Sequence, residues 1–209
     1  MPYPSRTDKR SIVEAAIDVL NDQGLDRLSL RAIAGHLGVR QPALYHHVPN
    51  KAALLDDVAA AVLGRWHTQR SPRHGENWED FLARYARSFR RAMLTVRDGA
   101  RLVASTGSRS PAPERAMRQL SVLEDAGFST TDAILALIAV TRYTIGSTLE
   151  QQTARDDGDI VLEVGDAAET DHPTASFFAA TREVVALGQD HEFDFGLTAV
   201  IRGLRPPST

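Results

Sequence analysis

The chain has 209 residues, of which 43% are hydrophobic, enough for one sizeable core or for a small domain joined to a larger one. It contains no cysteine, which excludes disulfides, thiol nucleophiles, thiolate zinc sites and iron–sulfur clusters. Residues 1–6 lack an apolar secretory segment, and the longest apolar stretch, residues 133–140, is too short to span a bilayer. We therefore expect a soluble, cytoplasmic protein without a membrane partner.

Charge is distributed unevenly along the chain, although the formal net charge is only −3. No Asp or Glu occurs in residues 27–51, where Arg31 and Arg40 lie between a flanking arginine and lysine. In residues 150–171 the pattern is reversed, since acidic residues surround a single Arg155. A basic segment near one end and an acidic one far from it indicate two separate tasks.

Apolar residues recur with helical periodicity nearly throughout, and no stretch alternates as a half-buried strand would, so we expect an all-α fold. The first helix is predicted at about residues 7–22, with Gly24 ending it. Ser29 is expected to cap a short second helix, which Gly38 ends with a left-handed turn.

A third short helix is predicted to begin at Gln41, with Pro42 in its first position, and to end near His47 because Pro49 disfavours helical geometry in the preceding residue. Asn50 then caps a fourth helix from residue 51 to about residue 67. Residues 70–75 contain proline, serine and glycine and are predicted to be a loop.

A larger helical domain follows. Its helices are expected at about residues 78–94, 99–105, 113–125, 130–153, 174–187 and 190–204. The acidic stretch 156–171 is poor in large apolar residues and is predicted to be a mobile loop. We therefore expect a small domain in residues 1–50, a connecting helix in residues 51–70 and a larger domain in residues 71–209.

The spacing of three residues in the small domain is that of a helix-turn-helix. Ala34 is small where the two helices would cross, Gly38 would take a positive φ in the turn, and Leu44 would anchor the second helix to the core. The remaining positions would face outward toward DNA. The candidate DNA-binding residues are Arg31, Gln41, Pro42, Ala43, Tyr45, His46, His47 and Lys51.

Each of these side chains has a chemistry that suits DNA. Gln41 can form paired hydrogen bonds with the edge of adenine, and the methyl group of Ala43 can contact that of thymine. Tyr45 and His47 can reach phosphate oxygens. Lys51 would bring an ammonium group to the same helix end whose free N–H groups attract phosphate. Taken singly, Arg31, Tyr45 and His46 are better explained as solvated side chains, but together these residues favour DNA binding.

The run LSLRAIAGHLGVRQPALYHHVPNKAALLDDVA resembles the DNA-binding domain of the tetracycline repressor family. The segments WEDFLARYARSF, RDGARL, AGFS and YTIGSTLEQQ resemble pieces of the ligand-binding domain of the same family. The similarity covers most of the chain and is weakest in residues 156–171. It implies a transcriptional repressor that is released from a palindromic operator, a double-stranded DNA, by a small-molecule inducer.

In that family two subunits pair through a four-helix bundle, which implies a homodimer joined by residues 130–153 and 190–204. The apolar faces that fit this role are Ile134, Leu137, Ile138, Ile145 and Leu149 on the first helix, and Phe193, Leu197, Val200, Ile201 and Leu204 on the second. The alternative is that these residues only fill the core of one subunit.

The resemblance also places an inducer site. The implied contacts fall on His67, Tyr85, Phe89, Val103, Thr106, Gln119 and Glu150. Val103 stands where the tetracycline site places a histidine that holds magnesium, and a valine cannot bind a metal. We therefore expect no metal site and no cofactor, and an inducer that is polycyclic or aromatic, stacked on Phe89 and Tyr85, without a magnesium chelate.

Two alternatives remain open. An enzyme is disfavoured because the sequence has no glycine-rich phosphate loop after a strand, no HExxH motif and no nucleophile elbow. His67 and Glu150 could form an acid–base pair only if the fold brings them together, so no catalytic residue is assigned. The second alternative is a DNA-binding regulator that does not respond to small molecules.

Overall fold

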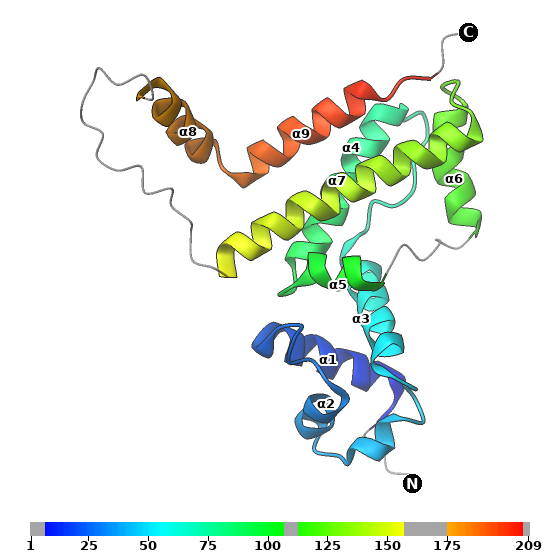
Figure 1. Cartoon of the computed structure of the whole chain (residues 1–209). Helices are drawn as coiled ribbons and strands as arrows, with labels where there is room; N and C mark the ends of the chain where they lie inside the picture. The colour runs from blue at the N-terminus through cyan, green and yellow to red at the C-terminus, as the bar shows by residue number, and fades with distance from the viewer. Residues whose placement is uncertain (1–6, 107–112, 157–174, 207–209) are drawn as a thin grey trace.

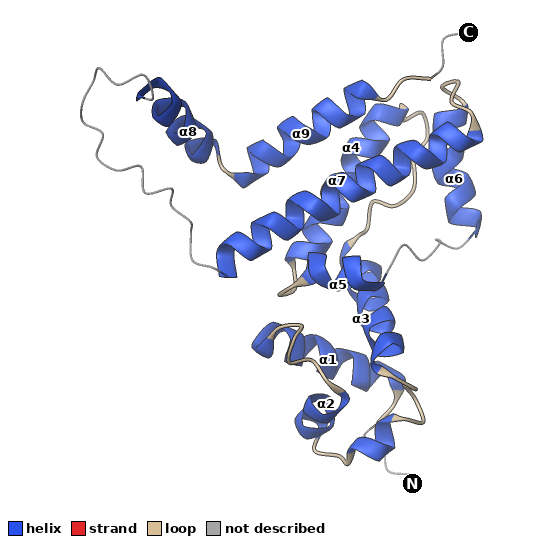
Figure 2. Cartoon of the chain, viewed as in Figure 1, coloured by secondary structure: helices blue, strands red, loops and turns tan. Residues whose placement is uncertain are grey.

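The computed structural model describes residues 7–106, 113–156 and 175–206, and its regular structure within those ranges is helical (Figure 2). These residues form nine α-helices and one short 3-10 helix, so the expected all-α fold is confirmed for this part of the chain. A small N-terminal domain and a larger helical domain are joined by α3, which runs from one to the other (Figure 1).

The small domain contains α1 (Lys9–Gln23), α2 (Leu30–Leu37), the 3-10 helix η1 (Gln41–Leu44) and the start of α3 (Lys51–Trp66). Each α-helix begins at a side chain, Asp8, Ser29 or Asn50, that accepts a hydrogen bond from a backbone N–H three residues later. The apolar core that these helices share also includes Val96 and Leu102 of the larger domain. The two domains are therefore packed together rather than only tethered.

The third predicted helix is shorter than expected. Residues 41–47 do not form one helix, because η1 stops at Leu44, whose carbonyl accepts hydrogen bonds from the N–H groups of His47 and Val48 at 3.0 and 2.9 Å. Both bonds close the segment into turns before α3 begins.

The larger domain contains α4 (Trp78–Leu94), α5 (Gly99–Thr106), α6 (Pro113–Glu124), α7 (Thr130–Asp156), α8 (Ala175–Leu187) and α9 (Gln189–Gly203). Each agrees with its predicted range to within about three residues. Helix α7 is central, since it packs against α4, α5, α6 and α9. All but the first residue of the predicted mobile loop at 156–171 lies outside the described residues.

Helix α7 is also long and apolar enough, by length and composition alone, to pass as a membrane span over Thr130–Ala154. It nevertheless carries the buried polar residues Thr144, Thr148 and Gln151. The two threonine hydroxyls donate to carbonyl oxygens one turn back, at 2.7 and 2.6 Å. With α4, α5, α6 and α9 packed on it, one side of α7 belongs to the core of the domain, and its other side is exposed.

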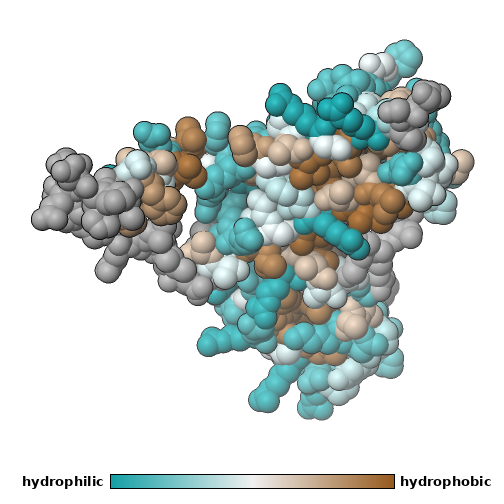
Figure 3. All heavy atoms as spheres, turned by 45° about the horizontal axis from the view of Figure 1, so that its top comes forward, coloured by the Kyte–Doolittle hydropathy of each residue, from teal (hydrophilic) through white to brown (hydrophobic). Residues whose placement is uncertain are grey.

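The expectation that the apolar face of α9 pairs with a second subunit is wrong for its largest residues. Phe193, Leu197 and Ile201 are buried within the subunit, in one cluster with residues of α4 and α7. On α7 two residues of the expected face, Ile134 and Ile138, are uncovered together with Leu135, whereas on α9 the uncovered side chain is Phe195, which was not expected and is 74% exposed. Figure 3 shows apolar patches over this part of the surface and on α8.

Candidate DNA interface and ligand site

The turn of the predicted helix-turn-helix is present, although its second helix is only the short η1. Ala34 and Leu44 are buried, and Gly38 is left-handed with φ 66° and ψ 32°. Its N–H donates back toward the last turn of α2, which closes the turn between the two helices.

The candidate DNA-binding residues lie on the surface of this domain. Arg31, Pro42, Tyr45, His46, His47 and Lys51 are exposed, and Gln41 and Ala43 are half-buried. The Gln41 amide Nε2 donates to the Tyr45 hydroxyl at 3.0 Å, so the two side chains are held together on the outer face of η1. The face carries no carboxylate from residue 27 to residue 51, which makes it electropositive.

A second candidate site begins where α3 ends. His67 follows the last residue of α3, and its N–H donates to the carbonyl of Leu63 at 3.1 Å. The imidazole is only 4% exposed and lies against two rings of α4, 4.7 Å from that of Tyr85 and 5.3 Å from that of Phe89. The structure therefore brings three of the predicted inducer contacts together.

The imidazole of His67 is neutral. Burial is the main cause that lowers its pKa to about 3, and the charges of Arg70 and Arg115 lower it further. Its Nδ1 lies 3.1 Å from the hydroxyl of Ser88, which also accepts from the N–H of Gln69 at 3.2 Å. This pattern favours a Ser88 hydroxyl that donates to Nδ1, which leaves the imidazole proton on Nε2. That nitrogen is buried and has no hydrogen-bond partner in the described structure.

The other predicted contacts are distributed unequally. Gln119 of α6 is buried and donates from Nε2 to the carbonyl of Arg70 at 2.7 Å, next to His67. Val103 packs in a small apolar cluster with Phe89. The hydroxyl of Thr106 donates to the carbonyl of Val103 at 3.0 Å, within its own helix. Glu150 is exposed on α7, and no described contact joins it to the rest.

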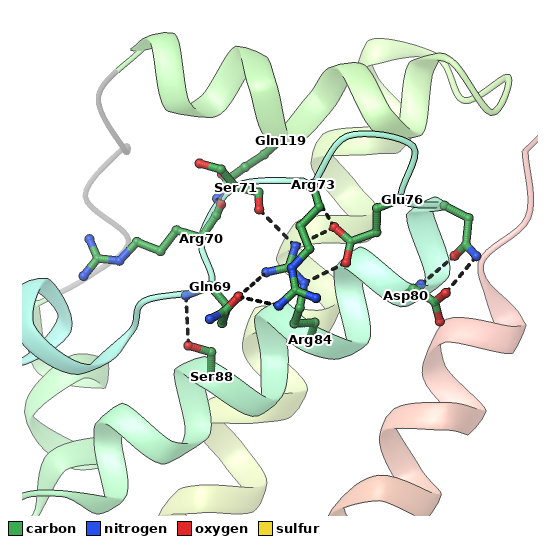
Figure 4. A network of polar contacts seen from close by, with 10 residues as sticks. Gln69, Arg70, Ser71, Arg73, Glu76, Asp80, Arg84, Ser88 and Gln119 are labelled. Atoms are coloured by element: carbon green, nitrogen blue, oxygen red, sulfur yellow. Dashed lines mark hydrogen bonds and ion pairs between the residues drawn. The ribbon is translucent and has the colours of Figure 1, made fainter.

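The loop after His67 is fixed by an ion-pair network rather than serving as a simple linker (Figure 4). The Arg84 guanidinium contacts the Glu76 carboxylate at 2.5 and 2.7 Å and the side-chain oxygen of Gln69 at 2.9 Å. These bonds hold the pKa of Glu76 below its usual range. The network keeps the segment from Gln69 to Glu76 in place on α4.

The larger domain also touches the small domain at the turn between α4 and α5. Asp98, with φ 55°, accepts a hydrogen bond from the N–H of Leu25 at 2.7 Å. Three residues later, Arg101 forms two bonds with the carboxylate of Asp26, at 2.9 and 2.6 Å. This turn is therefore a second connection between the domains, in addition to α3.

Sequence reasoning missed three residues of the ligand site. Ser88, Arg70 and Arg115 act on His67 through a hydrogen bond and through charge, and none matches a motif position. No pattern in the sequence could have found them, because the three residues stand in separate segments of the chain and act on His67 only in the folded protein. No group of three or more metal-binding side chains occurs among the described residues.

One helix, α3, connects a helix-turn-helix domain to a helical domain with a buried site lined by aromatic rings. This arrangement defines a class of DNA-binding regulator. The model for bacterial regulatory proteins of the tetR family matches residues 12–58, and that for the tetracyclin repressor-like C-terminal domain matches residues 71–206. The chain belongs to the TetR family.

Its similarity to individual proteins extends over nearly the whole chain. The class C tetracycline repressor protein of Escherichia coli is 41% identical over 200 residues, which are 96% of this chain and 91% of the relative. A tetracycline repressor variant from Acinetobacter baumannii AYE, solved in complex with minocycline, has a TM-score of 0.84 and 38% identity, with 97% of each chain covered.

Two further solved structures show other bound molecules. The class A tetracycline repressor, in complex with an anhydrotetracycline and magnesium, has a TM-score of 0.71 and 37% identity over 93% of this chain and 95% of that one. BioQ, in complex with its double-stranded DNA operator, has a TM-score of 0.69 and 26% identity over 95% of this chain and 98% of that one.

Proposed function

We propose that this chain is a cytoplasmic transcriptional repressor that binds operator DNA as a homodimer and is released by a small molecule. The observation that carries the proposal is the course of α3. Its first residue, Lys51, lies beside the exposed face of η1, and the residue after its end, His67, lies in the buried site. One rigid element thus joins the DNA face to the ligand site.

Coupling between the two sites follows from the length of this helix. Sixteen residues at 1.5 Å each make α3 about 24 Å long. A ligand that favours another tilt of α3 changes the separation of the two η1 segments of a dimer. Because operator half-sites lie about one DNA turn apart, a small change in separation weakens binding.

The homodimer is supported by apolar side chains that one subunit leaves uncovered. Ile134 and Ile138 lie one turn apart on α7, and Phe195 is exposed on the neighbouring helix α9. A second copy of the chain would cover both helices and bury these side chains.

The inducer site has the character of a binder and not of an enzyme. No described contact joins His67 and Glu150, the pair considered for acid–base chemistry, and His67 is buried whereas Glu150 is exposed. The wall formed by Val103 and Phe89 is apolar, so a chelated metal would find no protein ligand there. A planar aromatic inducer bound without magnesium fits this wall.

The proposal is tested by fluorescence anisotropy with DNA from the region upstream of the gene and its neighbours. We expect nanomolar binding to one palindromic sequence and release by a member of a panel of polycyclic aromatic compounds. The paired variant Arg31→Ala with Lys51→Ala is the control that should lose DNA. Failure of the wild type to prefer any sequence would contradict repression, and binding that no compound alters would favour a regulator without an inducer.

A further inference from the structure

Arg70 lies at the edge of the buried site and is only partly satisfied. Its Nε donates to the carbonyl of His67 at 2.6 Å, but its Nη2 is buried without a hydrogen-bond partner in the described structure. Figure 4 shows its side chain extending away from Arg84 and Glu76, the nearby ion pair. The carboxylate of Glu76 is therefore engaged elsewhere and does not neutralise Arg70.

A second arginine, Arg115, stands on α6, the helix that packs on the segment containing Arg70 through Gln119. Gln119 of this helix bonds the backbone of Arg70, and Arg115 lies one helical turn before Gln119 on the same face. The charge of Arg115 acts on both Arg70 and His67 and lowers the pKa of each, after the larger effect of burial. No ion pair of Arg115 with a carboxylate exists within the described ranges.

The site thus offers hydrogen-bond donors and positive charge, but no described carboxylate pairs with them. His67 presents a buried Nε2 and Arg70 a buried Nη2 in the segment after α3, and Arg115, on α6, has no ion pair among the described residues. Two cations held close together, partly buried and without a counter-ion, raise the free energy of the ligand-free protein. An anion bound between them would satisfy these groups together.

We infer that the inducer of this repressor carries an anionic oxygen group, a carboxylate, which Arg70 and Arg115 bind while the neutral imidazole of His67 donates to a neighbouring oxygen. This inference rests on the proposed function and names the chemical class of its ligand. The guanidinium fork matches a carboxylate in shape and charge. The rest of the molecule would be aromatic, since the rings of Tyr85 and Phe89, 6.2 Å apart, border His67.

The test compares naphthalene-2-carboxylate with naphthalene-2-carboxamide, which share shape and differ in charge, by isothermal titration calorimetry. In the wild type the carboxylate should bind about tenfold more tightly than the amide. Arg115→Gln and Arg70→Gln should each reduce this ratio to about twofold or less. Arg118→Gln is the matched control, because Arg118 lies on the same helix but is exposed, and it should keep the wild-type ratio.

Thermal unfolding of the ligand-free variants gives a second measurement. If Arg70 and Arg115 form an anion site, they repel each other in the ligand-free protein. Arg115→Gln removes this repulsion and should raise Tm by about 2 °C. A lower Tm for this variant would mean that Arg115 has a structural role, and would overturn the inference. Equal affinity of the wild type for the two naphthalene compounds, or no measurable binding of either, would also overturn it.

Operator binding separates this inference from the function on which it rests. A wild type that binds operator and is released by neutral aromatic compounds, with no preference for the carboxylate, retains its proposed function and refutes the anionic inducer. A wild type that binds no operator refutes the proposed function itself.

Discussion

The two domains treat their buried polar groups differently. In the small domain the helix starts are capped by Asp8, Ser29 and Asn50, and no buried side-chain atom of its described residues lacks a partner. Among the described residues, the atoms that do lack one belong to His67 and Arg70, which follow α3, and to Arg90 in α4. The domain that presents a rigid surface to DNA is satisfied within itself, and the domain that receives a ligand is not.

The largest expected effect distinguishes the two faces of α9. Leu197 is 1% exposed in the subunit core, so Leu197→Glu buries a carboxylate without a partner and should lower the free energy of unfolding by about 5 kcal/mol. Phe195→Glu, on the exposed face, should leave the fold intact and convert the dimer to a monomer. Urea unfolding and light scattering measure the two results. A folded Leu197→Glu variant would contradict the core assignment, and a dimeric Phe195→Glu variant the proposed interface.

The unsatisfied site should appear in the dependence of stability on pH. The pKa of His67 is about 3 in the folded protein against 6.5 ordinarily, so the unfolded chain takes up a proton here that the folded protein does not. The stability that results is present above pH 6.5 and is lost as pH falls toward 3, by roughly 3 kcal/mol at pH 4.

Urea unfolding at pH 7 and pH 4 measures this loss against two variants. His67→Asn should lose about 3 kcal/mol less stability than the wild type between these pH values. His74→Gln, at an exposed histidine, should behave as the wild type does. Identical acid sensitivity of His67→Asn and the wild type would show that His67 is not the group responsible.

A smaller effect distinguishes base reading by Gln41 from phosphate contact by Lys51. Gln41→Ala should cost roughly 1 to 3 kcal/mol on the operator and little on random DNA, because only an amide has the paired groups that read a base. Lys51→Ala should weaken both DNAs alike and reduce the slope of log K against log salt by about one unit. Anisotropy titrations at several salt concentrations measure both. Equal losses on operator and random DNA for Gln41→Ala would refute base reading.

No effect at all is expected from removing magnesium. Val103 is 7% exposed and packs among apolar residues, so inducer binding should be the same in Mg²⁺ and in EDTA. Val103→His is the informative variant, since it should gain a metal-dependent response to tetracycline. A tenfold loss of wild-type affinity in EDTA would contradict the assignment of Val103.

The sequence predicted best what local chemistry controls. Ser29 and Gly38 set the ends of α2 through a cap and a positive φ, and both effects depend on neighbours in the chain. Local chemistry could not show which apolar side chains of α9 are buried in the subunit and which are exposed. Phe193 and Phe195 are equally apolar, and only packing against α4 and α7 decides which is buried.

The ligand site shows the same limit. His67 and Phe89 could be placed through the resemblance, because Phe89 stands in a segment that matches the family and His67 lies between two such segments. Arg115 could not, since its role depends on α6 lying over the segment that contains Arg70. Charge that acts across the fold leaves no pattern along the chain.

The contact of Asp98 with Leu25 and of Arg101 with Asp26 has a mechanical consequence. A domain held only by α3 could swing in any direction about the end of that helix. A second attachment, on another element, removes most of these degrees of freedom and leaves rotation about the axis through the two points. Two attachments restrict the small domain to one axis of rotation. Under the proposed function, inducers of different shape should then produce the same rotation, so the fold and not the inducer would set how DNA is released.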